Sequence, residues 1–172
     1  HMFALFPEGG LVNNPKLRER TIRKNKEYGT NLQYMHFPKT SGFSQLIQIV
    51  GNKIQNVYTF ILVYNVTKQK LLGNKVDVIV KKVAKISDIP KEPSKEYVEK
   101  HKLTITDDNR LFYAHEEFLL KWTIETDKSL SICYSSLNPE DRPTISNIFN
   151  KTFPYEEEDS EDEDEDNNNN NK

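Results

Sequence analysis

Cysteine, tryptophan and methionine are scarce in this 172-residue sequence, which has one Cys, one Trp and two Met. The single thiol, Cys133, excludes an internal disulfide and a cysteine-rich metal site, and it fits a reducing compartment. Its place in a predicted helix favours a buried packing role over a nucleophilic one. Long apolar runs are also missing. The longest, residues 57–64, is far shorter than the roughly 20 residues that a membrane-spanning helix needs.

The balance of charge changes sharply near the C-terminus. Residues 156–166 contain ten acidic side chains, and a run of asparagine follows them. Such a composition cannot bury apolar surface, so we expect residues 151–172 to form a disordered acidic tail. Residues 1–155 carry 23 Lys and Arg against 16 Asp and Glu, a net charge of +7. A basic surface suits phosphate groups, coenzyme A or an anionic membrane, and it equally suits plain solvation.

The order of the predicted elements indicates an α/β fold with a mixed sheet and flanking helices, followed by a C-terminal helical segment. Strands are predicted where apolar runs are short, β-branched, alternating or stopped by proline: residues 3–6, 32–37, 57–64 and 75–86. Helices are predicted where apolar residues recur at helical spacing between caps: residues 16–28, 40–50, 94–101 and 112–131. Shorter helical fragments follow residue 138.

Three details of these elements are testable. Thr40 and Ser41 are the N-cap candidates for the second helix. The strand at 57–64 is strongly β-branched and aromatic, which predicts burial on both faces. The helix at 112–131 carries a broad apolar stripe, in which Trp122 is expected to be core rather than a ligand platform.

Two short motifs carry most of the chemical information. The first, Leu5-Phe6-Pro7-Glu8-Gly9, predicts a strand that ends in a carboxylate and a glycine turn. Such a carboxylate can accept a hydrogen bond from a substrate hydroxyl, and glycine lets backbone N–H groups approach a phosphate. On chemistry alone, a solvated or capping role for Glu8 is equally plausible. The second motif is His36-Phe37-Pro38-Lys39-Thr40, followed by Gly42-Phe43.

Together these motifs resemble the third and fourth conserved blocks of the glycerolipid acyltransferases, the lysophosphatidic acid acyltransferase-like enzymes. Their two prolines, Pro7 and Pro38, are 31 positions apart, and a similar separation is typical of the family. Gly42-Phe43 resembles the subgroup that acts on lysophosphatidylinositol and lysocardiolipin. Softer similarities continue in order through the strands at 57–64 and 76–83 to the helix around Trp122. The resemblance covers about residues 3–137.

The resemblance implies a fold, a reaction and a binding site. Residues 1–86 would be the C-terminal half of the acyltransferase domain, 87–150 a family-specific helical extension and 151–172 the tail. The family transfers an acyl group from acyl-coenzyme A, a co-substrate, to a lysophospholipid hydroxyl at the endoplasmic reticulum membrane. No further cofactor, metal or nucleic acid is implied. The acceptor-binding residues would be Glu8, Gly9, Gly10, Pro38, Lys39 and Thr40.

The sequence also departs from the family. The catalytic His-x4-Asp block is missing, because the residues five positions after the four histidines are Phe6, Ser41, Thr106 and Leu120. Gly10-Leu11 replaces the hydroxyl and polar residue that usually follow Glu-Gly. We therefore expect a C-terminal portion of an acyltransferase that is inactive alone. A non-catalytic lipid- or protein-binding module of the same fold is the first alternative, and an unrelated adaptor with a partner-recruiting acidic tail is the second.

Overall fold

The computed structural model describes residues 14–64 and 76–150. The helices are α1 (Pro15–Tyr28), α2 (Thr40–Val50), α3 (Lys95–His101), α4 (Arg110–Cys133) and α5 (Ile145–Asn150), and the strands are β1 (Asn56–Tyr64) and β2 (Val76–Lys85). Short 3-10 turns, η1 to η3, lie at Gly51–Lys53, Ile86–Asp88 and Pro139–Asp141. The predictions for the strand at 3–6, for Glu8, Gly9 and Gly10, and for the tail lie outside the described residues.

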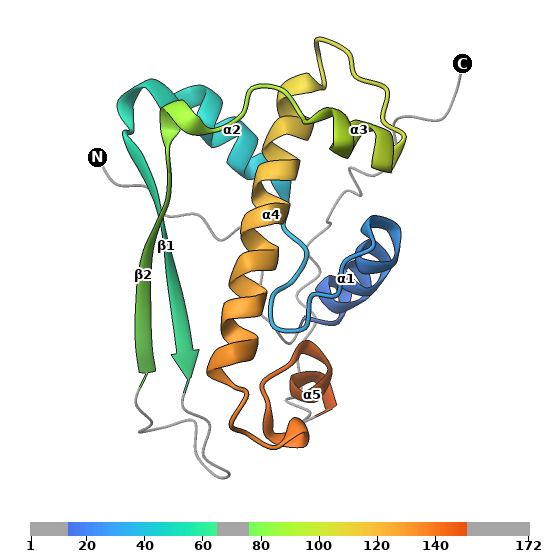
Figure 1. Cartoon of the computed structure of the whole chain (residues 1–172), viewed down its shortest axis with the longest axis vertical. Coiled ribbons are helices and arrows are strands. Elements are labelled where there is room, and N and C mark those ends of the chain that lie inside the picture. The colour runs from blue at the N-terminus through green and yellow to red at the C-terminus, as the bar shows by residue number, and fades with distance from the viewer. Residues whose placement is uncertain (1–13, 65–75, 151–172) are drawn as a thin grey trace.

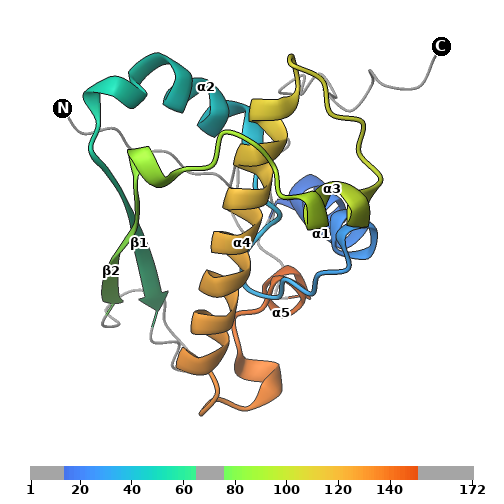
Figure 2. The same cartoon turned by 45° about the horizontal axis from the view of Figure 1, so that its top comes forward.

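The long helix α4 is the central column of the molecule (Figure 1). The β1–β2 hairpin lies on one side of α4, while α1 and α3 lie on the other, an arrangement that both views show (Figure 2). Helix α2 packs on α4 near one end of this column. Because none of the described helices is long and apolar enough, none could cross a bilayer.

The predicted helices are confirmed, with caps that explain their ends. Asn14 begins α1 by accepting hydrogen bonds from the N–H groups of Lys16 and Leu17, and Gly29 ends it in the left-handed conformation, at φ 63°. Ser94 caps α3 through the N–H of Tyr97. The predicted caps of α2 are wrong, because Lys39 is the N-cap and its side chain accepts nothing. A lysine side chain has donors only, so it cannot cap a helix N-terminus.

The predicted strand at 32–37 is also wrong, since this segment forms an irregular loop. Its apolar residues are buried as a strand pattern would require, with Tyr34 and Phe37 only 6% and 1% exposed. However, the N–H groups of residues 33–35 bind a side chain of α4 instead of a neighbouring strand. The described sheet therefore has two antiparallel strands, and the molecule is a mixture of helices with this small sheet.

The β1–β2 hairpin is buried on one face only, which corrects the prediction of a strand buried on both faces. Thr59, Ile61 and Val63 are buried on the side of α4, whereas Tyr58 and Phe60 are 52% and 63% exposed. The pairing runs from Asn56↔Lys85 to Tyr64↔Val76 with one irregularity between Val57 and Tyr58. Only one layer, α4 with its partners, covers this sheet among the described residues.

The core consists of three apolar clusters that meet on α4. Leu130 packs with the inner face of β1, Leu120 packs with α1 and α3, and Leu119 packs with α2. Trp122 is half-buried against two of these clusters, as expected for a core residue. Cys133 is exposed at the end of α4, so the expectation of a buried thiol is wrong. The boundary predicted near residue 86 stays a prediction.

Candidate functional site

The described part of the predicted acceptor site lies where the irregular loop of residues 32–39, the 32–39 loop, leads into α2. The side chain of Asn25 in α1 holds the start of this loop. Its Nδ2 donates to the carbonyl of Leu32 (3.2 Å), and its Oδ1 accepts from the N–H of Leu32 (3.2 Å) and from the hydroxyl of Thr30 (2.7 Å). This amide therefore substitutes for the strand pairing that the sequence pattern predicts.

Asp127 holds the middle of the 32–39 loop. Its Oδ1 accepts three backbone N–H groups, from Gln33 (3.0 Å), Tyr34 (2.7 Å) and Met35 (2.9 Å). Burial raises the pKa of the Asp127 carboxyl above its usual value, while the three donors pull that pKa back down. One buried oxygen thus satisfies three donors that would otherwise lie in the protein interior without a partner.

Thr21 and Arg20 of α1 hold the end of the loop. The Thr21 hydroxyl accepts the N–H of Phe37 (3.0 Å), donates to the carbonyl of Leu17 (2.8 Å) and lies 3.0 Å from Nδ1 of His36. The Arg20 guanidinium donates to the carbonyls of Phe37 (2.5 Å) and Pro38 (2.9 Å). The last turn before α2 is therefore fixed by two adjacent side chains of α1.

Of the six predicted acceptor-binding residues, the structure describes Pro38, Lys39 and Thr40, and they differ in how accessible their side chains are. Pro38 is almost fully buried, and Thr40 is 5% exposed, so neither side chain is open to a ligand in this conformation. Lys39 is half-buried at the N-cap of α2, and it is the one of the three with an accessible side chain. The site combines the ammonium group of Lys39 with the positive end of the α2 dipole, and this combination favours an anion.

A buried hydroxyl–imidazole pair lies one helical turn further along α2. Nδ1 of His115 is 2.9 Å from the hydroxyl of Ser44, which also accepts a hydrogen bond from Gln48 Nε2 (3.2 Å). Burial lowers the pKa of His115, so its neutral form is favoured and Nδ1 can accept from Ser44. Ser44 and His115 are 4% and 1% exposed, and the ring of Phe43 packs edge-on against the imidazole. No substrate reaches such a pair, so it is a packing contact rather than a nucleophile with its base.

A second buried carboxylate, Glu116, joins three helices. Its oxygens accept the hydroxyls of Tyr28 of α1 (3.2 Å) and Tyr97 of α3 (2.8 Å). Burial raises the pKa of Glu116, and the two hydroxyls partly offset that rise. The His101 ring packs against both tyrosine rings, with centroid distances of 4.6 and 4.5 Å. The pKa of each tyrosine is raised by burial and by the nearby Glu116.

The neighbouring Glu117 ties α4 to the start of α3. It accepts the N–H and the hydroxyl of Ser94, both at 2.7 Å, and forms an ion pair with Lys121 at 2.6 Å. Burial alone would raise the pKa of Glu117, but Lys121 and Ser94 together lower it. Glu117 therefore stabilises the fold as a charged group.

These α4 carboxylates carry no predicted role, although the sequence contains a signal for them. Positions 116, 120, 123, 127 and 130 are spaced by three or four residues and share one helical face. Leu120, Thr123 and Leu130 make that face largely apolar, so Glu116 and Asp127 on it require buried partners. The partners themselves come from distant segments that no local pattern could identify.

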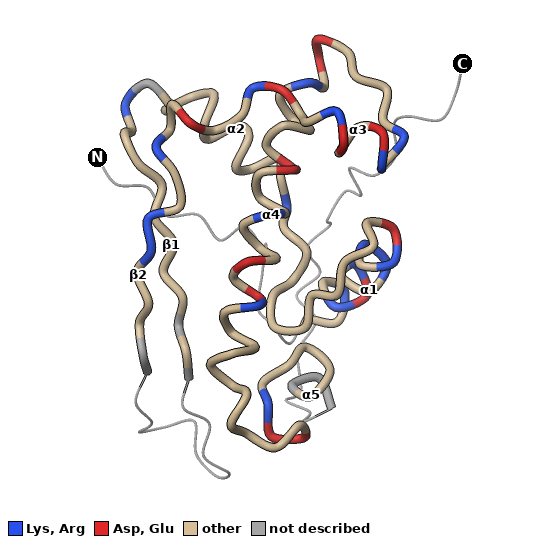
Figure 3. Tube along the Cα trace, viewed as in Figure 1, with Lys and Arg blue, Asp and Glu red and all other residues tan. Residues whose placement is uncertain are grey.

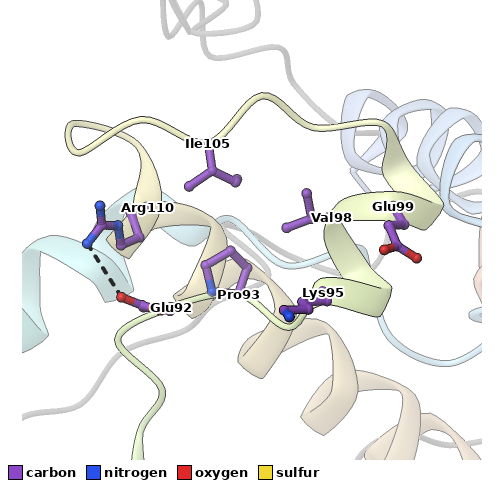
Figure 4. A pocket seen from close by; sticks show the side chains of 7 residues that line it. All are labelled: Glu92, Pro93, Lys95, Val98, Glu99, Ile105 and Arg110. Atoms are coloured by element: carbon purple, nitrogen blue, oxygen red, sulfur yellow. Dashed lines mark hydrogen bonds and ion pairs between the residues drawn. The ribbon is translucent and has the colours of Figure 1, made fainter.

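Two surface hollows are found among the described residues, and Lys39 lines neither of them. One open groove, of about 350 Å³, is lined by Glu92, Pro93, Lys95, Val98, Glu99, Ile105 and Arg110 (Figure 4). An ion pair between Arg110 and Glu92 crosses its rim. A second hollow, of about 620 Å³, lies where the base of the hairpin meets η1 and η2. Both are shallow and of mixed polarity, so neither has the enclosed apolar lining of a small-molecule site.

In the part of the chain that the structure describes, no group of His, Cys, Asp and Glu side chains is arranged to hold a metal ion. The site is therefore defined by one lysine on a fixed loop, at the start of a helix.

No protein-family model, curated protein or solved structure matches this chain.

Proposed function

We propose that this chain supplies the acceptor-binding part of an acyl-coenzyme A:lysophospholipid acyltransferase that works at the endoplasmic reticulum membrane in phospholipid synthesis or remodelling. The observation that carries the proposal is the position of Lys39. It begins α2 and directly follows a loop that Asn25, Asp127, Thr21 and Arg20 hold in place. The motif resemblance assigns the same lysine to the acceptor pocket.

The chemistry of this position fits a phosphate ester. An ammonium group at the positive end of a helix attracts a dianion, and the fixed loop lets Lys39 bind without ordering the backbone first. The buried Pro38 and Thr40 would then shape the loop rather than touch the acceptor. Glu8, Gly9 and Gly10 would complete the pocket from the other motif.

The reaction itself needs residues that this sequence does not contain. A histidine base must take the proton of the acceptor hydroxyl before that oxygen attacks the thioester carbonyl. The sequence has no His-x4-Asp, and the buried His36 and His115 are not accessible. We therefore propose that the chain alone binds the acceptor without transferring an acyl group.

Titration of the isotopically labelled chain with glycerol 3-phosphate, followed by amide NMR, tests the binding step. The expected result is a saturable shift of the Lys39, Thr40 and Ser41 amides. Lys39→Ala should weaken binding roughly tenfold, as expected for one charged hydrogen bond, and Lys39→Arg should weaken it less. Lys128→Ala, at an exposed lysine of α4, is the matched control and should leave binding unchanged. Equal effects of Lys39→Ala and Lys128→Ala would contradict the proposal.

A non-catalytic binding module of the same fold is the second candidate, favoured by the Gly10-Leu11 departure within the first motif. The two candidate functions predict different results for a longer chain that carries a His-x4-Asp motif upstream of this sequence. Acyl transfer by that chain, with a raised acceptor KM in Lys39→Ala, supports the enzyme. Binding of lysophospholipid with no turnover supports the module.

A further inference from the structure

Positive charge is concentrated on α1 among the described helices and strands. This 14-residue helix has six basic side chains against two acidic ones, whereas β2, the next most basic element, has three against one. Figure 3 shows the blue segments along α1, on the side of α4 away from the hairpin. The basic residues are Lys16, Arg18, Arg20, Arg23, Lys24 and Lys26, and the acidic ones are Glu19 and Glu27.

Three of these basic side chains point to solvent together. Lys16, Arg23 and Lys26 are exposed, and their spacing of seven and three residues places them on one face of the helix. Glu27 forms an ion pair with Lys24 at 3.2 Å, so part of the acidic charge of α1 is balanced within the helix. We call the exposed side that carries Lys16, Arg23 and Lys26 the cationic α1 face.

The same chain carries a run of the opposite charge. Residues 156–166, the acidic segment, contain ten acidic side chains and one serine. The acidic segment begins six positions after Asn150, the last residue of α5. The place of α5 in the fold therefore decides which basic surface lies within its reach.

Helix α5 lies on the same side of α4 as α1. The N–H of Ile145, at the start of α5, donates to the carbonyl of Gln33 (2.7 Å). The neighbouring Leu32 donates its N–H to Asn25 of α1 (3.2 Å). Both views show α5 and α1 on one side of α4 and the hairpin on the other (Figures 1 and 2). The described chain thus ends close to the cationic α1 face.

The residues between α5 and the acidic segment are long enough for a contact with α1. Six residues span at most about 20 Å, and a helix of 14 residues is about 21 Å long. A connection this short holds the two charged segments at an effective concentration in roughly the millimolar range. The lysines of β2 lie on the other side of α4, so both proximity and charge favour α1 over the hairpin.

We propose that the acidic segment binds the cationic α1 face of its own chain and competes there with other polyanions. Each contact joins two solvated charges and is weak, so binding comes from several contacts together and is screened by salt. The acidic segment needs no secondary structure of its own for such binding. An outside polyanion must displace the acidic segment before it reaches α1. This competition is independent of any acyltransferase activity.

A nitroxide label within the acidic segment of the full chain tests the contact by amide NMR. Ser160→Cys supplies the attachment site, and Cys133→Ser removes the exposed native thiol. At low ionic strength, the amide signals of α1 should be broadened more strongly than those of the hairpin. Sodium chloride at about 0.5 M should remove most of that difference, because it screens exposed charges.

Charge reversal separates binding from simple proximity along the chain. Lys16→Glu combined with Lys26→Glu should reduce the broadening of α1 to the level seen at high salt. Lys82→Glu combined with Lys85→Glu, at two exposed lysines of β2, is the matched control and should leave the broadening unchanged. All four lysines are exposed, so the circular dichroism of both variants should match that of the parent. Broadening of α1 that survives the reversal of Lys16 and Lys26 would overturn the proposal.

Heparin binding tests the competition. Replacing the ten acidic residues of 156–166 by their amides should strengthen heparin binding roughly tenfold, as expected if the acidic segment occupies the face in about nine of ten molecules. This gain should fall below about twofold when Lys16→Glu and Lys26→Glu are also present, because the two changes act on one contact. A gain of equal size in both backgrounds would overturn the proposal, since it would reflect net charge alone.

A mixed sample distinguishes the chain's own acidic segment from that of a second copy. Isotopically labelled chain without nitroxide is combined with unlabelled chain that carries the nitroxide at position 160. The α1 signals are expected to stay sharp in this mixture. Broadening of α1 as strong as in the singly labelled chain would overturn the proposal, because it would assign the contact to a second copy.

Discussion

Replacing Asp127 by alanine removes the one acceptor shared by the N–H groups of Gln33, Tyr34 and Met35. Tyr34 and Met35 are 6% and 9% exposed, so water does not easily replace the lost carboxylate. A buried donor left without a partner costs about 1–3 kcal/mol, and three neighbouring donors released at once can rearrange together, so their costs do not simply add. We therefore expect Asp127→Ala to lower the free energy of unfolding by about 3–5 kcal/mol.

Asp127→Asn distinguishes the acceptor from the charge. The amide oxygen still accepts hydrogen bonds. Because the amide is neutral, it does not carry the cost of burying a charge, which raises the pKa of the native carboxyl. The expected loss is therefore smaller, about 1–2 kcal/mol. Urea denaturation followed by circular dichroism measures both variants, and amide exchange of residues 33–35 reports whether the loop opens locally.

Glu125→Ala on the same helix is the control, because Glu125 is exposed and its ion pair with Lys81 spans 3.9 Å. It should change the free energy of unfolding by no more than about 0.5 kcal/mol. The reasoning is refuted if Asp127→Ala is as mild as Glu125→Ala. It is also refuted if Asp127→Asn is as damaging as Asp127→Ala.

Three further predictions concern caps and titrating groups. Because the pKa of Glu117 is lowered, its contribution to stability is present above the unfolded pKa of about 4.3 and is lost as the pH falls through the folded pKa. In Glu117→Gln the free energy of unfolding should therefore fall less steeply as the pH is lowered through this range. The raised pKa of Glu116 predicts the opposite pH dependence. The contribution of Glu116 to stability is fully present below its unfolded pKa of about 4.3 and is lost as the pH rises through the folded pKa. Urea denaturation at a series of pH values should therefore show no such loss in Glu116→Gln. Gly29→Ala should cost about 1 kcal/mol in thermal unfolding, since φ is 63° and no atom lies within 4 Å of the added carbon, and Gly29→Asn should cost less. An unchanged melting temperature in Gly29→Ala would contradict the prediction that a side chain at this position strains the backbone.

The helices were predictable from sequence because their signals are local. Asn14, Gly29 and Ser94 act on backbone groups within five residues of themselves, so their caps can be read from a short window. The hairpin strands were also predictable from β-branched alternation. Burial on the second face was not, because periodicity describes one strand and says nothing about how many layers cover it.

The 32–39 loop shows where local patterns fail. Its apolar residues are buried in the way a strand predicts, but the hydrogen bonds of its backbone go to side chains of α1 and α4. Asn25 and Asp127 are ordinary polar residues in sequence, and nothing in their own surroundings indicates that they bind the backbone of this loop, which for Asp127 lies 92 to 94 positions away. For the same reason the burial of Pro38 and Thr40 was not predictable from their own sequence, and the role of Lys39 stays a prediction.

The bond between Asp127 and the 32–39 loop also has a consequence for synthesis on the ribosome. The three N–H groups lie 92 to 94 positions ahead of their acceptor in the chain. While the chain grows, the segment that carries Lys39 emerges long before α4, and at that stage its backbone has no carboxylate to bind. Asn25, Thr21 and Arg20 precede the loop and can hold its two ends, but the middle of the loop is fixed only after α4 has been translated. A chain cut short before residue 127 would contain both motifs and still lack the acceptor that holds the loop.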